Sequence, residues 1–155
     1  MGLSLEFYAG DAEKIGAAFT EIDFDGLRDG TLAHSYADLS LHLALTDLDI
    51  LCEQIGAKLG RAAVPLLDSL EWTVGGTPDE SEASVVSGAW VSTMAGVPLE
   101  QVPQITRAWL EAVAEESGDE VVTDSPDAAA AVASLVTLCR EAVSRGTRVV
   151  FAWYL

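Results

Sequence analysis

Arg148-Val149-Val150-Phe151-Ala152-Trp153-Tyr154-Leu155 is apolar on both of its alternating faces from Val149 onward. A strand with one face in water alternates apolar and polar residues, whereas a strand buried on both faces reads as a continuous apolar run. Residues 148–154 therefore predict a central strand in a sheet, with a covering layer on each side.

Two earlier segments show the alternation of a half-buried strand. The first covers residues 3–8, where Leu3, Leu5 and Phe7 alternate with more polar neighbours. The second covers residues 37–45 and has the clearest alternation in the chain, with leucine at every second position from 39 onward. Together with the C-terminal strand, these segments predict a small mixed sheet.

Four to five helices are expected to pack on this sheet. Apolar residues recur at helical spacing in the segments 11–19, 46–59, 86–96, 103–118 and 125–145. The last segment carries the fullest boundary signals, with Ser125 as N-cap, Pro126 in the first turn and Gly146 after the end. Between residues 64 and 74 we expect a turn followed by a short strand. No repeat or long linker interrupts the pattern, so we predict a single α+β domain over residues 1–155.

The composition is that of a globular protein, with 50% hydrophobic and 21% charged residues in a chain of 155. A chain of this length buries roughly 70% of the surface that it exposes when unfolded, so it can form a core without disulfides. No apolar run reaches the roughly 20 residues of a membrane helix, and the first residues do not resemble an export signal. We expect a cytoplasmic protein in which Cys52 and Cys139 are reduced and buried. The basic residues are mostly arginine and alanine is abundant, which is typical of a GC-rich bacterial source.

The net charge of −17 is concentrated in one part of the chain. Between Asp79 and Asp127 there are 11 acidic residues and one basic residue, Arg107. Such a surface repels phosphate backbones and anionic headgroups, which argues against nucleic-acid and membrane binding. It attracts a basic protein partner, although its only role could also be to keep the protein soluble. The candidate interaction residues are Glu111, Glu115, Glu116, Asp119 and Glu120.

Acid–base or nucleophilic chemistry has one candidate location, the polar face of the strand predicted around residue 40. If the strand extends back to residue 34, this face carries both histidines, a phenol, a carboxylate and a hydroxyl. These candidate catalytic residues are His34, Tyr36, Asp38, Ser40 and His42. Same-face neighbours lie about 6.6 Å apart, so Asp38 and His42 would be about 13 Å apart and could not share a proton or metal ion unaided. The alternative is a face covered by solvent or by a partner.

A calcium-loop pattern is incomplete. The segment Glu21-x-Asp23-x-Asp25-Gly26 places acids at positions 1, 3 and 5 and glycine at position 6 of an EF-hand-like loop. Position 12 is Leu32, so the bidentate carboxylate is missing, and we predict a turn. The common nucleotide, zinc and hydrolase motifs are absent from the sequence. We therefore expect neither a metal ion nor a cofactor; a small anion site near Arg140, Arg145 and Arg148 is a weaker alternative.

No motif identifies an activity, so three functional hypotheses stay open. The first is a non-enzymatic accessory or interaction protein, regulator-like or immunity-like, that binds a basic partner. The second is a small hydrolase-like or ligand-binding domain that uses the face between residues 34 and 42, and the third is a homodimer that covers this face. The four tryptophans lie on predicted apolar stripes and should fill the core. An exposed tryptophan would instead mark an interface or a ligand pocket.

Overall fold

The strand predicted at the C-terminus lies at the centre of a sheet. The structure is a computed structural model that describes residues 2–41, 43–118 and 125–155. The five strands in these ranges are β1 Ser4–Gly10, β2 Ala33–Asp38, β3 Leu70–Thr77, β4 Ser81–Val86 and β5 Arg148–Tyr154. Their order is β2-β1-β5-β4-β3. All neighbouring strands run antiparallel, so the sheet is antiparallel rather than mixed.

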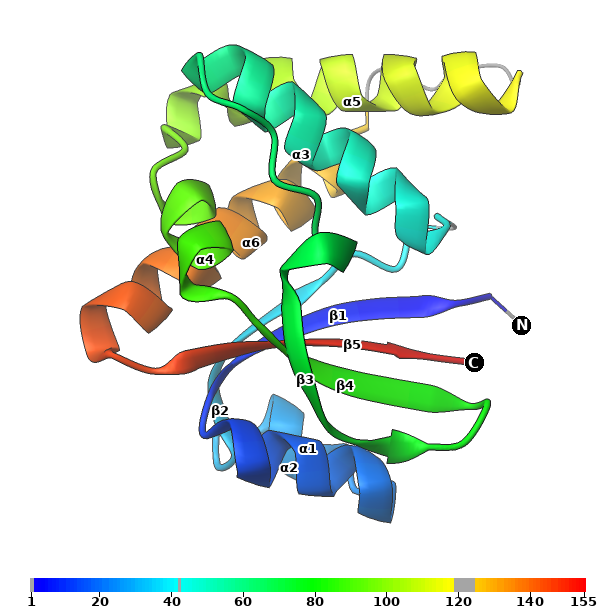
Figure 1. The fold of residues 1–155 in the computed structure, drawn as a ribbon, viewed down its shortest axis with the longest axis vertical. Helices are drawn as coiled ribbons and strands as arrows, with labels where there is room; N and C mark the ends of the chain where they lie inside the picture. Colours follow the sequence, from blue (N-terminus) through cyan, green and yellow to red (C-terminus); the bar gives the residue numbers. More distant parts are fainter. Residues whose placement is uncertain (1, 42, 119–124) are drawn as a thin grey trace.

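Helices cover both faces of the sheet (Figure 1). Those in the described ranges are α1 Ala12–Glu21, α2 Asp25–Arg28, α3 Leu45–Leu59, α4 Gly88–Ala95, α5 Val102–Ser117 and α6 Pro126–Arg145, with single 3₁₀ turns at Leu67–Ser69 and Leu99–Gln101. The pair α1 and α2 packs on one face, and α3, α4, α5 and α6 lie on the other. The predicted α+β class is confirmed; the helix beyond the predicted four to five is α2, a single turn.

β5 shows why the chain forms three layers. Val149 and Phe151 point into the larger core, beneath the four helices, and Val150 and Ala152 point into the smaller core, beneath α1 and α2. All four side chains are buried. A strand with apolar side chains on both faces removes its surface from water only when both faces are covered, as the sequence predicts.

The strand predicted over residues 37–45 is displaced toward the N-terminus. β2 ends at Asp38, and α3 begins at Leu45. The Asp38 carboxylate accepts a hydrogen bond from the Ser40 backbone N–H at 2.8 Å, and Ser40 Oγ accepts one from the Leu5 N–H at 2.9 Å. These side chains replace the next ladder bonds and end the strand. The alternating leucines beyond this point pack against the larger core from an irregular connection.

The helix α1 makes a close contact with the edge strand β3. A Cβ atom on Gly16 would lie 2.3 Å from the carbonyl oxygen of Val74, and one on Gly75 would lie 1.8 Å from the carbonyl oxygen of Gly16. Glycine at both positions therefore allows the helix backbone to approach the strand backbone. Thr20 fixes the same contact, because its hydroxyl accepts a hydrogen bond from the Gly76 N–H at 3.2 Å.

Candidate functional site

His34 lies apart from the other candidate catalytic residues. It sits at an irregularity in the pairing of β1 with β2, where Gly10 pairs with Ala33 and Ala9 pairs with Ser35. Its Nδ1 is 2.8 Å from Ser35 Oγ and its Nε2 is 2.8 Å from Thr147 Oγ1, just beyond the end of α6. The bulge thus turns His34 away from the face that carries Tyr36.

Tyr36 and Asp38 lie on the face of β2 that α1 and α2 cover, and both are exposed. Ser40 lies beyond the strand, where its hydroxyl is bonded to the backbone of β1. His42 lies outside the described residues. Among the four described candidates, the structure brings together Tyr36 and Asp38, and the chemistry available to that pair depends on the neighbouring side chain of Glu6.

Glu6 is the buried centre of a polar cluster that sequence reasoning missed. We define the Glu6 cluster as Glu6, Tyr8, Arg28, Tyr36 and Tyr154. Glu6 is 1% exposed, and its carboxylate accepts hydrogen bonds from Tyr8 at 2.5 Å, from Arg28 at 2.9 Å and from Tyr154 at 2.9 Å. Tyr36 approaches the same carboxylate at 3.4 Å. The cluster joins β1, α2, β2 and β5 around one charge.

The Glu6 cluster is a structural cross-link rather than reactive machinery. Burial and the charge of Glu6 raise the pKa values of Tyr8, Tyr36 and Tyr154, so the phenols remain protonated donors at neutral pH. Both carboxylate oxygens already accept hydrogen bonds. A buried charge with this number of donors is satisfied, and its donors are committed to it.

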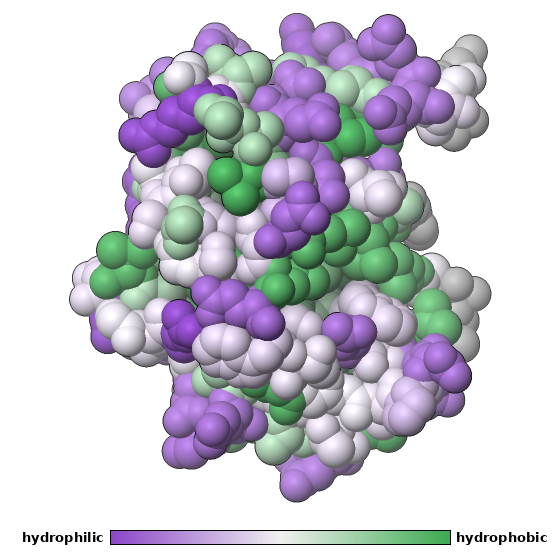
Figure 2. Space-filling model, viewed as in Figure 1, coloured by the Kyte–Doolittle hydropathy of each residue, from purple (hydrophilic) through white to green (hydrophobic). Residues whose placement is uncertain are grey.

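The acidic surface has few internal partners. The ion pairs in the described ranges join Arg28 to Glu6, Arg145 to Glu141 and Arg148 to Glu71. The predicted interaction residues Glu111, Glu115 and Glu116 are exposed on α5, and Asp119 and Glu120 lie outside the described residues. Hydrophilic residues accordingly dominate the end of the molecule where α5 lies (Figure 2). Most of the negative charge is therefore free to act on molecules in solution.

Trp72 is the exposed tryptophan. Trp90 and Trp109 are 3% and 0% exposed and fill the larger core, whereas 50% of the surface of Trp72 is exposed on β3. Trp72 borders a groove of about 460 Å³ between β3 and α1. We define this α1–β3 groove by the residues that line it: Glu13, Ala17, Thr20, Glu21, Trp72, Thr73 and Val74.

The Trp72 ring already binds a cation of the protein itself. The guanidinium carbon of Arg148 lies 5.0 Å from the centre of the ring, and the same guanidinium is 3.1 Å from the Glu71 carboxylate. An arginine between an aromatic face and a carboxylate is a favourable arrangement at a protein surface. The ring is half exposed, and it lines a groove that also carries the acidic residues Glu13 and Glu21.

The described residues show no metal centre. They contain no group of three or more His, Cys, Asp and Glu side chains placed to hold a metal ion. The segment with the incomplete calcium pattern forms the end of α1 and the single turn α2. None of the helices in the described ranges combines the length and apolar character that crossing a bilayer requires.

Both thiols are buried. Burial raises the pKa of Cys52 to about 11 and the pKa of Cys139 to about 12. Both side chains are therefore protonated at neutral pH, and neither is a thiolate nucleophile.

No model of a known protein family, no curated protein and no solved structure matches the chain.

Proposed function

We propose that the protein is a non-enzymatic interaction protein of the bacterial cytoplasm that binds a basic protein partner. The observation that carries this proposal is the half-exposed Trp72, which lines the α1–β3 groove together with the acidic residues Glu13 and Glu21. The partner inserts an arginine or lysine side chain into this groove. A regulator-like or immunity-like role is the specific form of the proposal.

The chemistry of the groove fits a cationic side chain. A guanidinium or ammonium group over an indole ring gains cation–π attraction, and an adjacent carboxylate adds a charge-assisted hydrogen bond. Arg148 makes both contacts with Trp72 and Glu71 within the protein. Tryptophan is also enriched among the residues that dominate binding energy at interfaces. The groove and a cationic side chain are thus complementary in charge.

The acidic residues of α5 have a different role in this proposal. α5 lies at the opposite end of the molecule from α1 along its longest axis (Figure 1). At physiological ionic strength, charges separated by more than about 8 Å are largely screened from one another. Glu111, Glu115 and Glu116 therefore contribute little to the affinity of a cation in the groove, which the groove residues determine. Their role in this proposal is to raise the rate of encounter with a basic partner.

The alternative function, a small hydrolase-like or ligand-binding domain, requires the polar residues between 34 and 42 to converge on one pocket. Of these, Tyr36 belongs to the satisfied Glu6 cluster and His34 is bonded to Thr147. No specific observation favours this alternative, so we do not propose it.

The proposal is tested with a fluorescently labelled hexa-arginine peptide as the probe, with binding measured by fluorescence anisotropy. The test variant Glu13→Lys/Glu21→Lys and the control variant Glu111→Lys/Glu115→Lys change the net charge equally. We expect the groove variant to weaken binding at least tenfold, which corresponds to about 1.4 kcal/mol. The α5 variant should weaken it less than threefold.

Two other results would contradict the proposal. If the α5 variant loses more affinity than the groove variant, the peptide binds the acidic helix, as the charge distribution of the sequence alone predicts. If the two variants lose affinity equally, binding reflects net charge and the groove has no specific role.

A further inference from the structure

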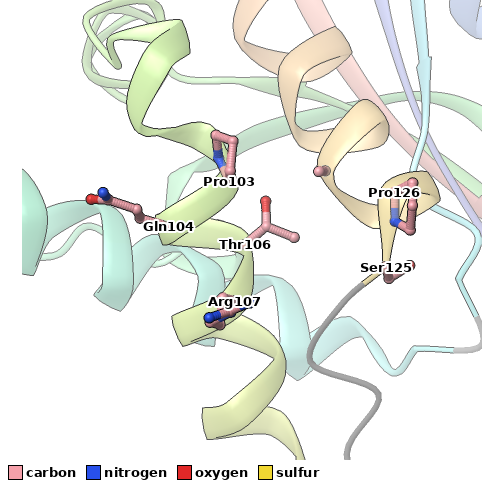
Figure 3. Close-up of a pocket in the computed structure, with 7 residues that line it drawn as sticks. Pro103, Gln104, Thr106, Arg107, Ser125 and Pro126 are labelled. Atoms are coloured by element: carbon pink, nitrogen blue, oxygen red, sulfur yellow. The ribbon is translucent and has the colours of Figure 1, made fainter.

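A pocket between α5 and α6 has the chemistry of an anion site. It has a volume of about 220 Å³ and opens between the first turns of α5 and the N-terminus of α6 (Figure 3). Thr106 and Arg107 line it from α5 and Ser125 lines it from the N-terminus of α6, whereas the amide of Gln104, which borders the pocket, is directed away from α6 (Figure 3). The lining thus combines a cation, two hydroxyl groups and a helix N-terminus.

Thr106 is the residue that indicates a ligand. Its side chain lines the pocket and is only 3% exposed, and within the described residues its hydroxyl has no hydrogen-bond partner. Buried hydroxyl groups in folded proteins almost always have a partner, because leaving one without a bond is unfavourable. A threonine in a helix commonly satisfies its hydroxyl at the carbonyl of the preceding turn, and Thr106 does not. The hydroxyl oxygen lies beneath the pocket surface without a protein bond, and a rotation of the side chain about χ1 would present it to a molecule in the pocket.

The groups around Thr106 are mainly donors. The Gln104 carbonyl oxygen accepts a hydrogen bond from Lys58 at 2.9 Å, which leaves the amide NH₂ group as the free part of that side chain. Arg107 belongs to none of the ion pairs in the described part of the chain. A guanidinium group binds planar and tetrahedral oxyanions through two parallel hydrogen bonds. Arg107 would attract an oxyanion in the pocket and repel a cation.

The N-terminus of α6 adds to the same preference. α6 is 20 residues long, and Ser125 caps it by accepting a hydrogen bond from the Ala128 N–H at 3.2 Å. The first turn of a helix leaves N–H groups without intrahelical partners and carries a partial positive charge. Arg107 is also the only basic residue between Asp79 and Asp127. The one cation in the most acidic part of the sequence thus lies beside a helix N-terminus.

We propose that this pocket binds a small oxyanion, a phosphate or carboxylate group, through Thr106, Arg107 and the N-terminus of α6. The anion accepts hydrogen bonds from the Thr106 hydroxyl and the Arg107 guanidinium and lies on the axis of α6. This site is independent of the α1–β3 groove, which takes a cation, and it stands if the proposal for the groove fails.

Inorganic phosphate is the probe, and the measurement is the shift of the backbone amide signals at the start of α6 in ¹⁵N–¹H correlation spectra at constant ionic strength. Thr106→Val removes the hydroxyl and keeps the side-chain volume, and Arg107→Gln removes the charge. Arg61→Gln, an exposed arginine outside the pocket, is the matched control. We expect saturable shifts in the wild type and the control, and at least a tenfold loss of affinity in each pocket variant. Repeating the titration with acetate distinguishes a phosphate site from a carboxylate site.

A second measurement, the melting temperature of Thr106→Val without ligand, tests whether the Thr106 hydroxyl is unbonded in the free protein. Because the hydroxyl has no protein partner, this variant should melt no lower than the wild type. A lower midpoint would show that the hydroxyl is already bonded, by an ordered water for example, and would overturn the proposal. Phosphate shifts that are absent in the wild type, or equal in all four proteins, would also overturn it.

Discussion

Replacing Glu6 with glutamine tests whether the Glu6 cluster stabilises the fold through its charge. Glu6 is 1% exposed and accepts hydrogen bonds at 2.5–2.9 Å from Tyr8, Arg28 and Tyr154. Glutamine has nearly the same size, but it is neutral and presents an NH₂ group in place of one acceptor oxygen. The substitution therefore changes the electrostatics of the cluster with little change in packing.

The expected loss follows from the three bonds. A hydrogen bond to a charged acceptor contributes roughly twice as much as one to a neutral acceptor, a difference of about 1 kcal/mol per bond. The side chain of Arg28 is 48% exposed, so solvent screening reduces its share. We expect Glu6→Gln to lower the free energy of unfolding by about 2–3 kcal/mol. For a chain of this size, that loss lowers the melting temperature by roughly 4–12 °C.

Urea denaturation followed by circular dichroism measures this loss. Glu116→Gln makes the same chemical change at an exposed position of α5 and should alter stability by less than about 0.5 kcal/mol. If Glu6→Gln lowers the free energy of unfolding no more than this control does, the Glu6 carboxylate does not hold the four elements together, and the reasoning about the cluster is wrong.

Three further predictions concern the packing, the thiols and the pH dependence. Gly16→Ala should lower the free energy of unfolding in urea by about 1–3 kcal/mol, because its Cβ would lie 2.3 Å from the Val74 carbonyl oxygen. Cys52 and Cys139 are buried with raised pKa values, so a thiol reagent such as Ellman's reagent should label neither in the native protein and both in denaturant. Partial burial, and then the charge of Arg145, lowers the pKa of His34 below its ordinary value of 6.5, so the unfolded state binds more protons near this pH. Stability should therefore fall as the pH drops through 6.5, and His34→Gln should remove part of that slope in urea titrations at several pH values.

The architecture was predictable where a segment is apolar on both faces. The run from Val149 to Tyr154 requires two covering layers, and β5 occupies the centre of the sheet with a helical layer on each side. The prediction is wrong at β2 because the pattern of alternating leucines records burial and not backbone pairing. The side chains of Asp38 and Ser40 end the strand by local hydrogen bonds that periodicity does not register.

β4 was not predictable from its pattern. The segment Ser81–Val86 begins with polar residues and contains Ala83 and Ser84, which are buried although they have little apolar surface. Ala83 packs in the smaller core beneath α1, where β4 lies between β3 and β5, and Ser84 faces the opposite side of the sheet. Tertiary packing thus overrides local β propensity here.

The Glu6 cluster and the α1–β3 groove differ in how much of each could be predicted from the sequence. Glu6 and Tyr8 lie on the polar face of a correctly predicted strand, but Arg28 and Tyr154 are 22 and 148 positions away from Glu6, and their convergence is a property of the fold. Trp72 lies on a predicted apolar stripe. It is exposed because β3 is an edge strand whose pairing with β4 is irregular on both sides of it.

The most direct test of the central claim is to locate a bound cationic peptide on the protein. Fluorine NMR of protein labelled with fluorotryptophan gives one signal for each of the four tryptophans, and Trp72 is exposed whereas Trp109 is buried. Titration with unlabelled hexa-arginine should move the Trp72 signal, with the same midpoint as the anisotropy measurement, and leave the Trp109 signal unchanged. If the peptide binds while the Trp72 signal does not move, the α1–β3 groove is not the binding site.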